Sequence, residues 1–133
     1  MPLDLGSAVK LLQHEISDLI AIYLFGSHAT DDAGPESDLD LAVLPGHPLE
    51  PVRRWHLQEE IARLLHTDVD LVDLLFASTV MRVQVIDGGR VLWEGQPSLR
   101  EAFEARALGA YARLNLARAG ILDDIKRLGT VHG

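Results

Sequence analysis

The sequence predicts one α/β (α+β) domain built on a small mixed β-sheet, with flanking helices and a long helix at the C-terminus. Three observations predict it: short apolar or alternating runs typical of strands, segments with apolar residues at helical spacing, and glycine or proline at the breaks. The 133 residues suffice for one hydrophobic core and not for two. We therefore expect a single domain over residues 1–133, with its core at about 8–95 and a C-terminal helical segment at about 98–128.

The N-terminal part predicts a helix followed by two strands. Apolar residues recur at helical spacing from about Ser7 to Asp18, and the Ser7 hydroxyl can cap the start of this helix. Leu19 to Phe25 is a continuous apolar run, which predicts a buried strand. Turn-forming residues fill the stretch from His28 to Ser37, and the alternation from Asp38 to Leu44 predicts the second strand.

The middle of the chain predicts a second helix, a third strand, a short helix and a fourth strand. The second helix is expected from Pro51 to Leu65, because proline suits the first turn of a helix. The third strand is expected from Asp68 to Leu75, the short helix from Thr79 to Ile86, and the fourth strand from Arg90 to Glu94. The apolar face predicted for the second helix comprises Leu57, Ile61, Leu64 and Leu65.

The C-terminal part predicts one long helix. Ser98 and Glu101 have the spacing of a capping box at its start. We expect the helix either to continue through Gly120 or to break there, and to end near Gly129. Tyr111 is interpreted as a core residue, with a partner contact or stacking on adenine as the alternative. The face predicted to pack comprises Phe103, Ala107, Tyr111 and Leu114.

Composition narrows the function classes. Twelve Lys or Arg against twenty Asp or Glu give a net charge of −8, which disfavours nonspecific binding to nucleic acid and suits a basic protein partner or a site that collects Mg²⁺. The absence of Cys excludes disulfides, thiolate catalysis and Cys-based zinc sites. The N-terminus lacks a signal pattern and no apolar run approaches the roughly 20 residues of a membrane span, so we expect a cytoplasmic protein without membrane contact.

Acids on two predicted strands form the candidate metal site. Side chains alternate along a strand, so Asp38 and Asp40 project to one face, about 7 Å apart. Such carboxylates repel each other unless a cation separates them, and Mg²⁺ prefers oxygen ligands. Asp70, inside the third predicted strand, is the candidate third ligand, which would let the site hold two ions. Asp68 shares its face but lies where that strand begins, and Asp73 is on the opposite face.

Gly26 and Ser27, which end the first predicted strand, are the candidate phosphate-binding residues. Glycine allows a sharp turn and a close approach to a ligand, while the Ser27 hydroxyl and the following N–H groups can bind phosphate oxygens. Taken alone, Asp38 and Asp40 would be interpreted as a solvated strand end. The spacing Gly-Ser, ten residues, Asp-x-Asp should match by chance in roughly one protein of this composition in several hundred, which favours a functional site.

Other charged residues are weaker candidates. His28 follows Ser27 and could lie near phosphates, although the six histidines lack metal-ligand spacing. Four arginines could each reach a triphosphate, and the sequence does not choose among them; each is more often a surface residue. They are Arg53, Arg54, Arg63 and Arg82.

The residues Gly26, Ser27, Asp38 and Asp40 resemble the GS-x10-D-x-D signature of the nucleotidyltransferase superfamily related to DNA polymerase β. The brevity of the chain resembles the minimal nucleotidyltransferase (MNT) branch, and Asp70 resembles the third metal-binding carboxylate. The likeness covers about residues 8–95. It implies the nucleotidyltransferase fold, ATP as substrate, and Mg²⁺, with two ions held by the three acids. It also implies that Gly26 and Ser27 bind the nucleotide and that the third acid helps to activate the acceptor hydroxyl.

The resemblance also implies a partner. Many free-standing MNT proteins are antitoxins that transfer AMP from ATP to a tyrosine of a helical HEPN ribonuclease toxin and so silence it. By resemblance, we expect an adenylyltransferase antitoxin able to form a hetero-oligomer with its toxin. Two alternatives stay open. One is a small-molecule adenylyltransferase of the aminoglycoside-modifying kind, although no second domain supplies a substrate pocket. The other is an antitoxin that acts by binding alone, although the three carboxylates are intact.

Overall fold

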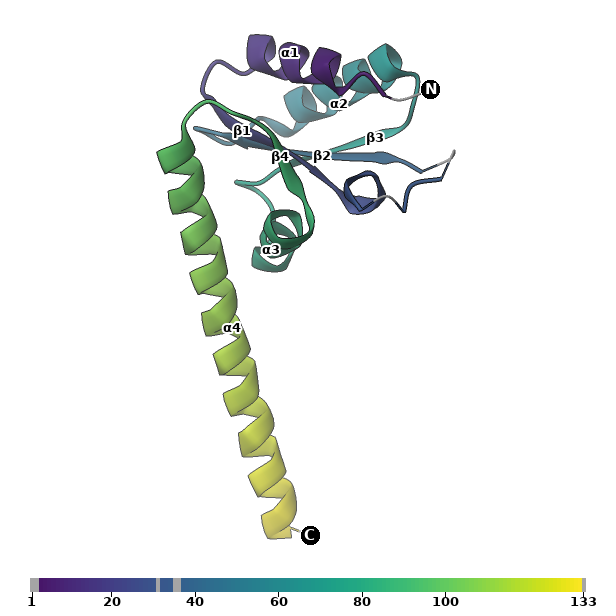
Figure 1. The fold of residues 1–133 in the computed structure, drawn as a ribbon. Coiled ribbons are helices and arrows are strands. Elements are labelled where there is room, and N and C mark those ends of the chain that lie inside the picture. Colours follow the sequence, from purple (N-terminus) through teal and green to yellow (C-terminus); the bar gives the residue numbers. More distant parts are fainter. Residues whose placement is uncertain (1–2, 31, 35–36, 133) are drawn as a thin grey trace.

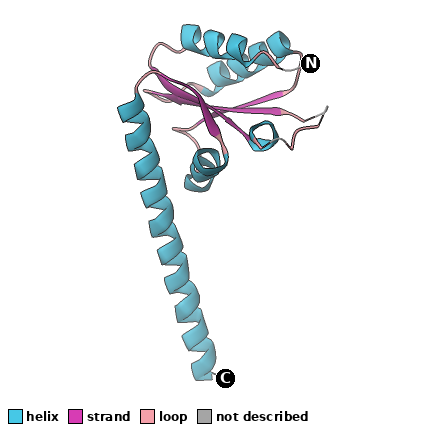
Figure 2. Cartoon of the chain, in the orientation of Figure 1, coloured by secondary structure: helices cyan, strands magenta, loops and turns pink. Residues whose placement is uncertain are grey.

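A mixed four-stranded β-sheet forms the centre of the structure, which is a computed structural model describing residues 3–30, 32–34 and 37–132 (Figure 1). Helices α1 and α2 cover one face of the sheet, α3 and the start of α4 cover the other, and the rest of α4 projects away (Figures 1 and 2). The elements in order are α1 (Leu5–Glu15), β1 (Leu19–Phe25), the 3-10 helix η1 (Gly26–Ala29), β2 (Leu39–Pro45), α2 (Pro51–Leu65), β3 (Val69–Asp73), α3 (Thr79–Gly88), β4 (Arg90–Glu94) and α4 (Pro97–His132).

The sheet has the strand order β3-β2-β1-β4. β1 pairs antiparallel with both β2 and β4, whereas β2 and β3 are parallel and are joined through α2. The predicted mixed sheet with a long C-terminal helix is therefore confirmed. β3 is shorter than predicted because the chain turns at Asp73, whose carbonyl accepts hydrogen bonds from Phe76 and Ala77.

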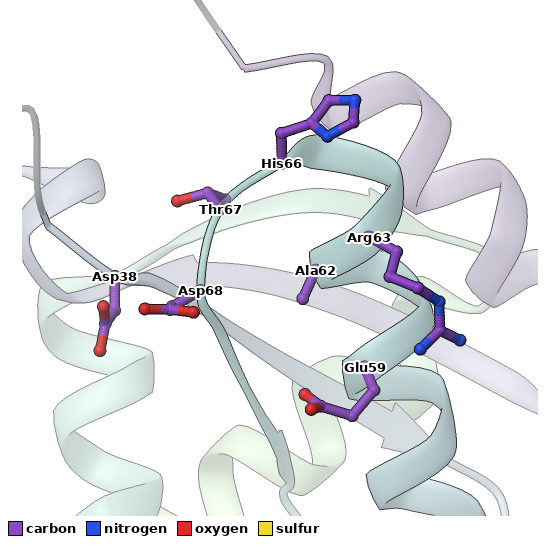
Figure 3. A pocket seen from close by; sticks show the side chains of 7 residues that line it. All are labelled: Asp38, Glu59, Ala62, Arg63, His66, Thr67 and Asp68. Atoms are coloured by element: carbon purple, nitrogen blue, oxygen red, sulfur yellow. The ribbon is translucent and has the colours of Figure 1, made fainter.

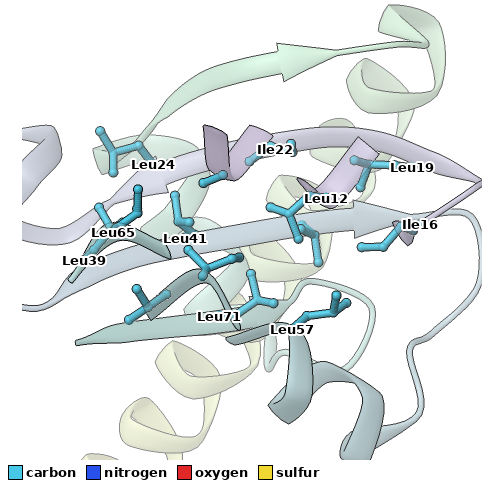
Figure 4. Close-up of a cluster of buried hydrophobic side chains, with 14 of the residues drawn as sticks. Leu12, Ile16, Leu19, Ile22, Leu24, Leu39, Leu41, Leu57, Leu65 and Leu71 are labelled. Atoms are coloured by element: carbon cyan, nitrogen blue, oxygen red, sulfur yellow. The ribbon is translucent and has the colours of Figure 1, made fainter. Parts of the chain in front are cut away.

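The first apolar layer lies between the sheet and the helices α1 and α2. Leu39, Leu41 and Leu71 of the strands are buried there against Leu12 of α1 and Leu57 of α2 (Figure 4). Because side chains alternate along a strand, burial of the odd-numbered residues at the start of β2 turns its even-numbered residues toward the other face.

The second apolar layer lies between the sheet and the helices α3 and α4. It contains Ala42 and Leu44 of β2, with Val85 of α3 and Phe103 of α4. Asp40 has the same strand parity as Ala42, so the candidate acid belongs to this second face of the sheet.

Both predicted helix caps are wrong. α1 begins at Leu5 and is capped by Asp4, whose carboxylate accepts hydrogen bonds from the backbone N–H of Ser7 at 3.2 Å and from its hydroxyl at 2.5 Å. α4 begins at Pro97, which places Ser98 inside the first turn. Proline is favoured at that first helical position because its fixed φ suits the helix.

Further differences concern helix faces and the end of α4. Leu64 is 48% exposed, because the buried stripe of α2 is centred on Ile61 and Leu65 and leaves Leu64 at its edge. α4 continues through Gly120 to His132 instead of ending near residue 129. Helix-favouring Ala, Leu and Arg residues surround Gly120 and offset its cost of about 1 kcal/mol. Tyr111 is half-buried and outside both buried clusters, so its core assignment is not supported.

Candidate active site

Three neighbouring strands bring Asp40 and Asp70 together. Asp40 of β2 pairs with Phe25 of β1 on one side and with Asp70 of β3 on the other. Adjacent strands lie about 4.8 Å apart, so the two acids occupy neighbouring positions in one row across the sheet. Asp38 was predicted to begin the second strand; it lies directly before β2, which starts at Leu39, and is exposed.

Gly26 closes this row at the end of β1. Its φ is +72°, a left-handed conformation that residues with a side chain rarely adopt. A Cβ atom at this position would lie only 2.1 Å from Oδ2 of Asp40. Glycine is therefore required both by the backbone turn and by the close approach of the Asp40 carboxylate.

The electrostatics of Asp40 reflect this crowding. Partial burial raises its pKa, and the charges of Asp70 and Asp38 raise it further, while His28 opposes the shift. Within residues 3–30, 32–34 and 37–132, no three His, Asp or Glu side chains already form a set of metal ligands. The carboxylates of Asp38, Asp40 and Asp70 offer the oxygen ligands that Mg²⁺ prefers, and a bound ion would offset the repulsion between them. To be coordinated by all three, Mg²⁺ would have to bring them closer together than they are in this structure.

A recess of about 540 Å³ opens beside the Gly26-Ser27 bend, between η1 and α3. Ser27 is half-buried in η1, and its carbonyl accepts hydrogen bonds from the N–H groups of Thr30 and Asp32. The recess is lined by Phe25, Gly26, Ser27, Thr30, Asp32, Gln84 and Gly88.

His28 lies in the same 3-10 helix and links it to the segment before β2. Its Nε2 lies 3.2 Å from the carbonyl oxygen of Ser37, so this nitrogen donates the hydrogen bond. The bond joins the Gly-Ser bend to the residue next to Asp38. His28 is therefore close to the acids, whereas the sequence suggested only that it could lie near phosphates.

A second recess, of about 660 Å³, adjoins Asp38 on the side of α2 (Figure 3). The carboxylates of Asp38 and Asp68 lie side by side at one end, and the backbone N–H of Leu39 donates to the carbonyl of Asp68 at 2.9 Å. From the sequence, Asp68 is interpreted as an ordinary exposed acid at the start of a strand. The parallel register of β2 and β3, which brings Asp68 beside Asp38, is not visible in the sequence. The other lining residues are Glu59, Ala62, Arg63, His66 and Thr67.

The four candidate arginines differ in what they contact. Arg54 donates to the carbonyl of Leu71 at 2.8 Å, and Arg82 donates to the carbonyls that follow β3, at 2.8 and 3.0 Å. Arg53 bonds the carbonyl of Glu15. Arg63 makes no hydrogen bond or ion pair within the described part of the chain and lines the recess beside Asp38. It is the arginine of the four with a guanidinium available to a ligand.

Asp73 is a buried acid with a structural role. It is 2% exposed, and its carboxylate accepts hydrogen bonds from the N–H groups of Leu49 at 2.7 Å and Leu75 at 2.9 Å. The bond from Leu49 fastens the end of β3 to the segment before α2, and the bond from Leu75 stabilises the turn that follows β3. The sequence placed Asp73 correctly on the face opposite Asp70 and gave no sign of its two donors.

Comparison with known families gives a match over most of the chain. Residues 7–98 match the family described as polymerase beta, nucleotidyltransferase. This span contains all five predicted site residues, which are Gly26, Ser27, Asp38, Asp40 and Asp70.

Individual relatives extend the similarity beyond residue 98. Protein adenylyltransferase MntA of Shewanella oneidensis is 40% identical over 123 residues, which cover 92% of this chain and 88% of the relative. A chain in the crystal structure of a toxin-antitoxin with AMP-PNP has a TM-score of 0.84 at 40% identity, covering 92% of this chain and 98% of that one. A chain in the complex of the tri-AMPylated Shewanella oneidensis HEPN toxin with MNT antitoxin has a TM-score of 0.76 at 39% identity, covering 90% and 93%.

Proposed function

This chain belongs to the polymerase beta nucleotidyltransferase family, and we propose that it is an antitoxin that transfers AMP from ATP to a tyrosine of a cognate HEPN toxin. The observation that carries the proposal is the row of Asp40 and Asp70 beside Gly26. The nucleotide and the acceptor are inferred from relatives, since one is named a protein adenylyltransferase and others were solved with AMP-PNP or an AMPylated HEPN toxin.

The recess beside Gly26 and Ser27 is the proposed site of ATP. Ser27 and Gln84 offer a hydroxyl and an amide at its lining, and the close packing of Gly26 against Asp40 keeps the acids next to it. Phosphate oxygens bound near Ser27 would therefore lie beside the carboxylates.

Asp38, Asp40 and Asp70 are the proposed Mg²⁺ ligands, with two ions expected. Their mutual repulsion, expressed in the raised pKa of Asp40, favours a cation between them. Bound Mg²⁺ would neutralise charge on the triphosphate and make a coordinated hydroxyl more acidic.

In the proposed reaction, the tyrosine oxygen bonds to the α-phosphorus of ATP. The bond from that phosphorus to the oxygen bridging to the β-phosphate breaks, and pyrophosphate leaves. The tyrosine proton passes to Asp70, which lies in the strand farther from the Gly26 bend and so faces an acceptor arriving from the opposite side.

An apolar recess of about 320 Å³ next to Asp70 suits an aromatic acceptor. Phe76 at its lining is 64% exposed, which is unusual for a side chain of this size unless it meets a partner. The remaining lining residues are Leu49, Pro51, Arg54, Leu71, Val72, Asp73 and Ala77. ATP on the Gly26 side and tyrosine on the Asp70 side would place the carboxylates between the reacting groups.

The proposal is tested by mixing the chain with labelled ATP, Mg²⁺ and the HEPN toxin encoded with it. We expect label on the toxin, none when EDTA is present, and none with the double variant Asp38→Asn plus Asp40→Asn. The matched control is Glu60→Gln, an exposed acid on α2 away from the site, which should transfer at the wild-type rate.

Two results would contradict the proposal. One is transfer by the double variant at the wild-type rate. The other is a double variant that transfers nothing yet silences the toxin as well as the wild type does, which would mean that binding alone neutralises it. Circular dichroism of the variants establishes that they are folded.

A further inference from the structure

β3 lies at the edge of the sheet, and β2 is its only partner strand among the described residues. At its two ends, the carbonyl of Asp68 accepts from the N–H of Leu39 at 2.9 Å, and the N–H of Leu74 donates to β2 at 3.0 Å. The even-numbered residues therefore bond to β2, and the backbone groups of the odd-numbered residues point to the open edge. One of these is Leu71, which directly follows the proposed metal ligand Asp70.

Two side chains of α2 bond to this open edge. The N–H of Leu71 donates to Oε1 of Gln58 at 3.0 Å, and the carbonyl of Leu71 accepts from Nη1 of Arg54 at 2.8 Å. Nη1 of Arg54 also donates to the same Oε1 at 3.2 Å. Arg54 and Gln58 are four residues apart, so they lie next to each other on one side of α2. This Arg54–Gln58 pair takes the place of a further strand at Leu71.

The chemistry of the Arg54–Gln58 pair determines which substitutions can preserve it. The amide of Gln58 meets two donors, the N–H of Leu71 and the guanidinium of Arg54, so its oxygen must face them. Leu71 is buried and the other two residues are half-buried, so an unpaired group here would be costly. A glutamate at position 58 would offer the same acceptor, whereas a methionine of similar length would offer none.

The peptide unit held by Gln58 is the one that joins Asp70 to Leu71. A peptide unit is planar, so fixing its N–H on the outer side also fixes the carbonyl of Asp70 on the inner side, where Asp70 pairs with Asp40 of β2. The backbone dihedral ψ of Asp70 is thereby constrained. Since the rotamers open to a side chain depend on its backbone dihedrals, the direction of the Asp70 carboxylate is constrained as well.

The carboxylate of Asp70 has no support of its own. Asp70 is exposed, and its carboxylate forms no hydrogen bond or ion pair with the residues that the structure describes. Asp73, at the other end of β3, is instead held by two N–H donors. The position of the Asp70 carboxylate therefore depends on how firmly the β3 backbone is held beside it.

A simpler role for the Arg54–Gln58 pair is protection of the strand edge. Open edges of sheets invite pairing with other chains, and side chains that occupy them prevent it. This role alone predicts that loss of the pair lowers stability or solubility and leaves the chemistry of each folded molecule unchanged. Both bonds to β3, however, converge on the residue next to Asp70, where a shift of the backbone would move a proposed metal ligand.

We propose that the Arg54–Gln58 pair positions Asp70. By holding the backbone of Leu71, it keeps the Asp70 carboxylate in the row with Asp40, where this acid can bind Mg²⁺ and take the proton of the acceptor. The inference rests on the proposed function for these two roles of Asp70. Gln58 acts through β3 alone, whereas Arg54 also lines the apolar recess next to Asp70, so Gln58 offers the more selective test.

The test compares three variants of the full chain in AMP transfer to the toxin. Gln58→Met removes the acceptor, Gln58→Glu keeps it, and Gln13→Met is the matched control at an exposed glutamine of α1. We expect Gln58→Met to lower kcat about tenfold to a hundredfold, the range seen when groups that orient metal ligands are removed. The KM for ATP should not change, because the proposed ATP site adjoins Gly26 of β1. Gln58→Glu should keep most of kcat, and Gln13→Met should match the wild type.

A second measurement needs no acceptor. The affinity for Mn²⁺ in the presence of AMP-PNP, followed by electron paramagnetic resonance, should fall about tenfold in Gln58→Met and remain close to the wild-type value in Gln58→Glu. Faster hydrogen exchange of the Leu71 amide would verify that the bond to position 58 is lost, and melting curves establish that the variants are folded. If Gln58→Met does not fold, Arg54→Met takes its place, with the same loss of kcat and Mn²⁺ affinity and a raised KM for the toxin.

The inference is overturned if Gln58→Met exchanges the Leu71 amide faster yet keeps the kcat and the Mn²⁺ affinity of the wild type, because the pair would then only cover the strand edge. It is also overturned if Gln58→Glu loses as much as Gln58→Met. A wild type that transfers no AMP to the toxin rejects the proposed function alone, and the Mn²⁺ affinities then decide whether the pair positions Asp70.

Discussion

The two ends of β3 carry acids in opposite situations. At its end, Asp73 is almost fully buried and accepts two backbone hydrogen bonds. Near its start, Asp70 pairs with Asp40, whose carboxylate is crowded by the charges of Asp70 and Asp38 and accepts no hydrogen bond from the residues that the structure describes. A buried acid that accepts hydrogen bonds from N–H groups stabilises the fold. Acids that are crowded together without such donors destabilise it by repulsion, and a bound cation can offset that destabilisation.

The largest effect expected from this contrast is on catalysis by Asp40. Asp40→Asn should lower the rate of AMP transfer about a thousandfold or more, because metal ligands contribute several kcal/mol to the transition state. Its thermal stability should be unchanged or higher, since a repulsive charge is removed. Rates from single turnovers and melting curves check both parts. An Asp40→Asn variant that is destabilised yet fully active would mean that Asp40 has the structural role assigned to Asp73.

Gly26→Ala tests how closely the bend approaches the acids. The added Cβ would lie 2.1 Å from Oδ2 of Asp40, and a left-handed backbone costs about 1–2 kcal/mol for a residue with a side chain. We expect a loss of transfer of about a hundredfold with a modest fall in melting temperature. The control is Gly6→Ala in α1, outside the proposed ATP recess, where a Cβ would meet only Oδ1 of Asp4, at an ordinary contact distance of 3.5 Å. Similar activity in both variants would show that the bend does not position Asp40.

Asp73→Ala should show the reverse pattern. Loss of the acceptor leaves the N–H groups of Leu49 and Leu75 unpaired, which should lower the unfolding free energy by about 2–4 kcal/mol. Transfer per folded molecule should remain near the wild-type value. Urea unfolding and active-site titration separate the two quantities, and a stable variant with lost activity would contradict the structural role.

The smallest expected effect is the dependence of stability on pH. The folded pKa of Asp40 is raised above the ordinary value of 3.8, so its protonated form is favoured in the fold. Its contribution to stability is fully present below pH 3.8 and is lost as pH rises through the raised value. Relative to Asp40→Asn, the wild type should therefore lose stability over this range, and Mg²⁺ should restore part of it. If urea unfolding instead shows that the wild type gains stability relative to Asp40→Asn as pH rises over this range, the repulsion inferred at Asp40 would be contradicted.

Local sequence patterns predicted much of this fold and its candidate site. The apolar run of β1, the proline start of α2 and the spacing of Asp38 and Asp40 are properties of consecutive residues, and the structure agrees with them. Local patterns do not determine the pairing of Asp40 with Asp70, because the register of the parallel strands β2 and β3 is set by the crossover through α2.

The predictions that the structure contradicts concern residues whose sequence pattern is compatible with more than one structural role. Asp4 and Ser7 are both good capping residues, and only the geometry selects Asp4. In α4 the apolar spacing is the same whether a side chain packs inside the fold or against another protein. The buried Ala107 and the exposed Ile121 are therefore alike in sequence and differ in structure.

The most direct test locates the metal. A crystal of the chain grown with AMP-PNP and Mn²⁺ would reveal the ions by their anomalous scattering. We expect Mn²⁺ coordinated by Asp38 and Asp40, with the triphosphate reaching Ser27 and Asp70 on the other side of the ions. Mn²⁺ held instead in the recess of Asp68 and Glu59, with the Asp40 carboxylate unliganded, would contradict this expectation.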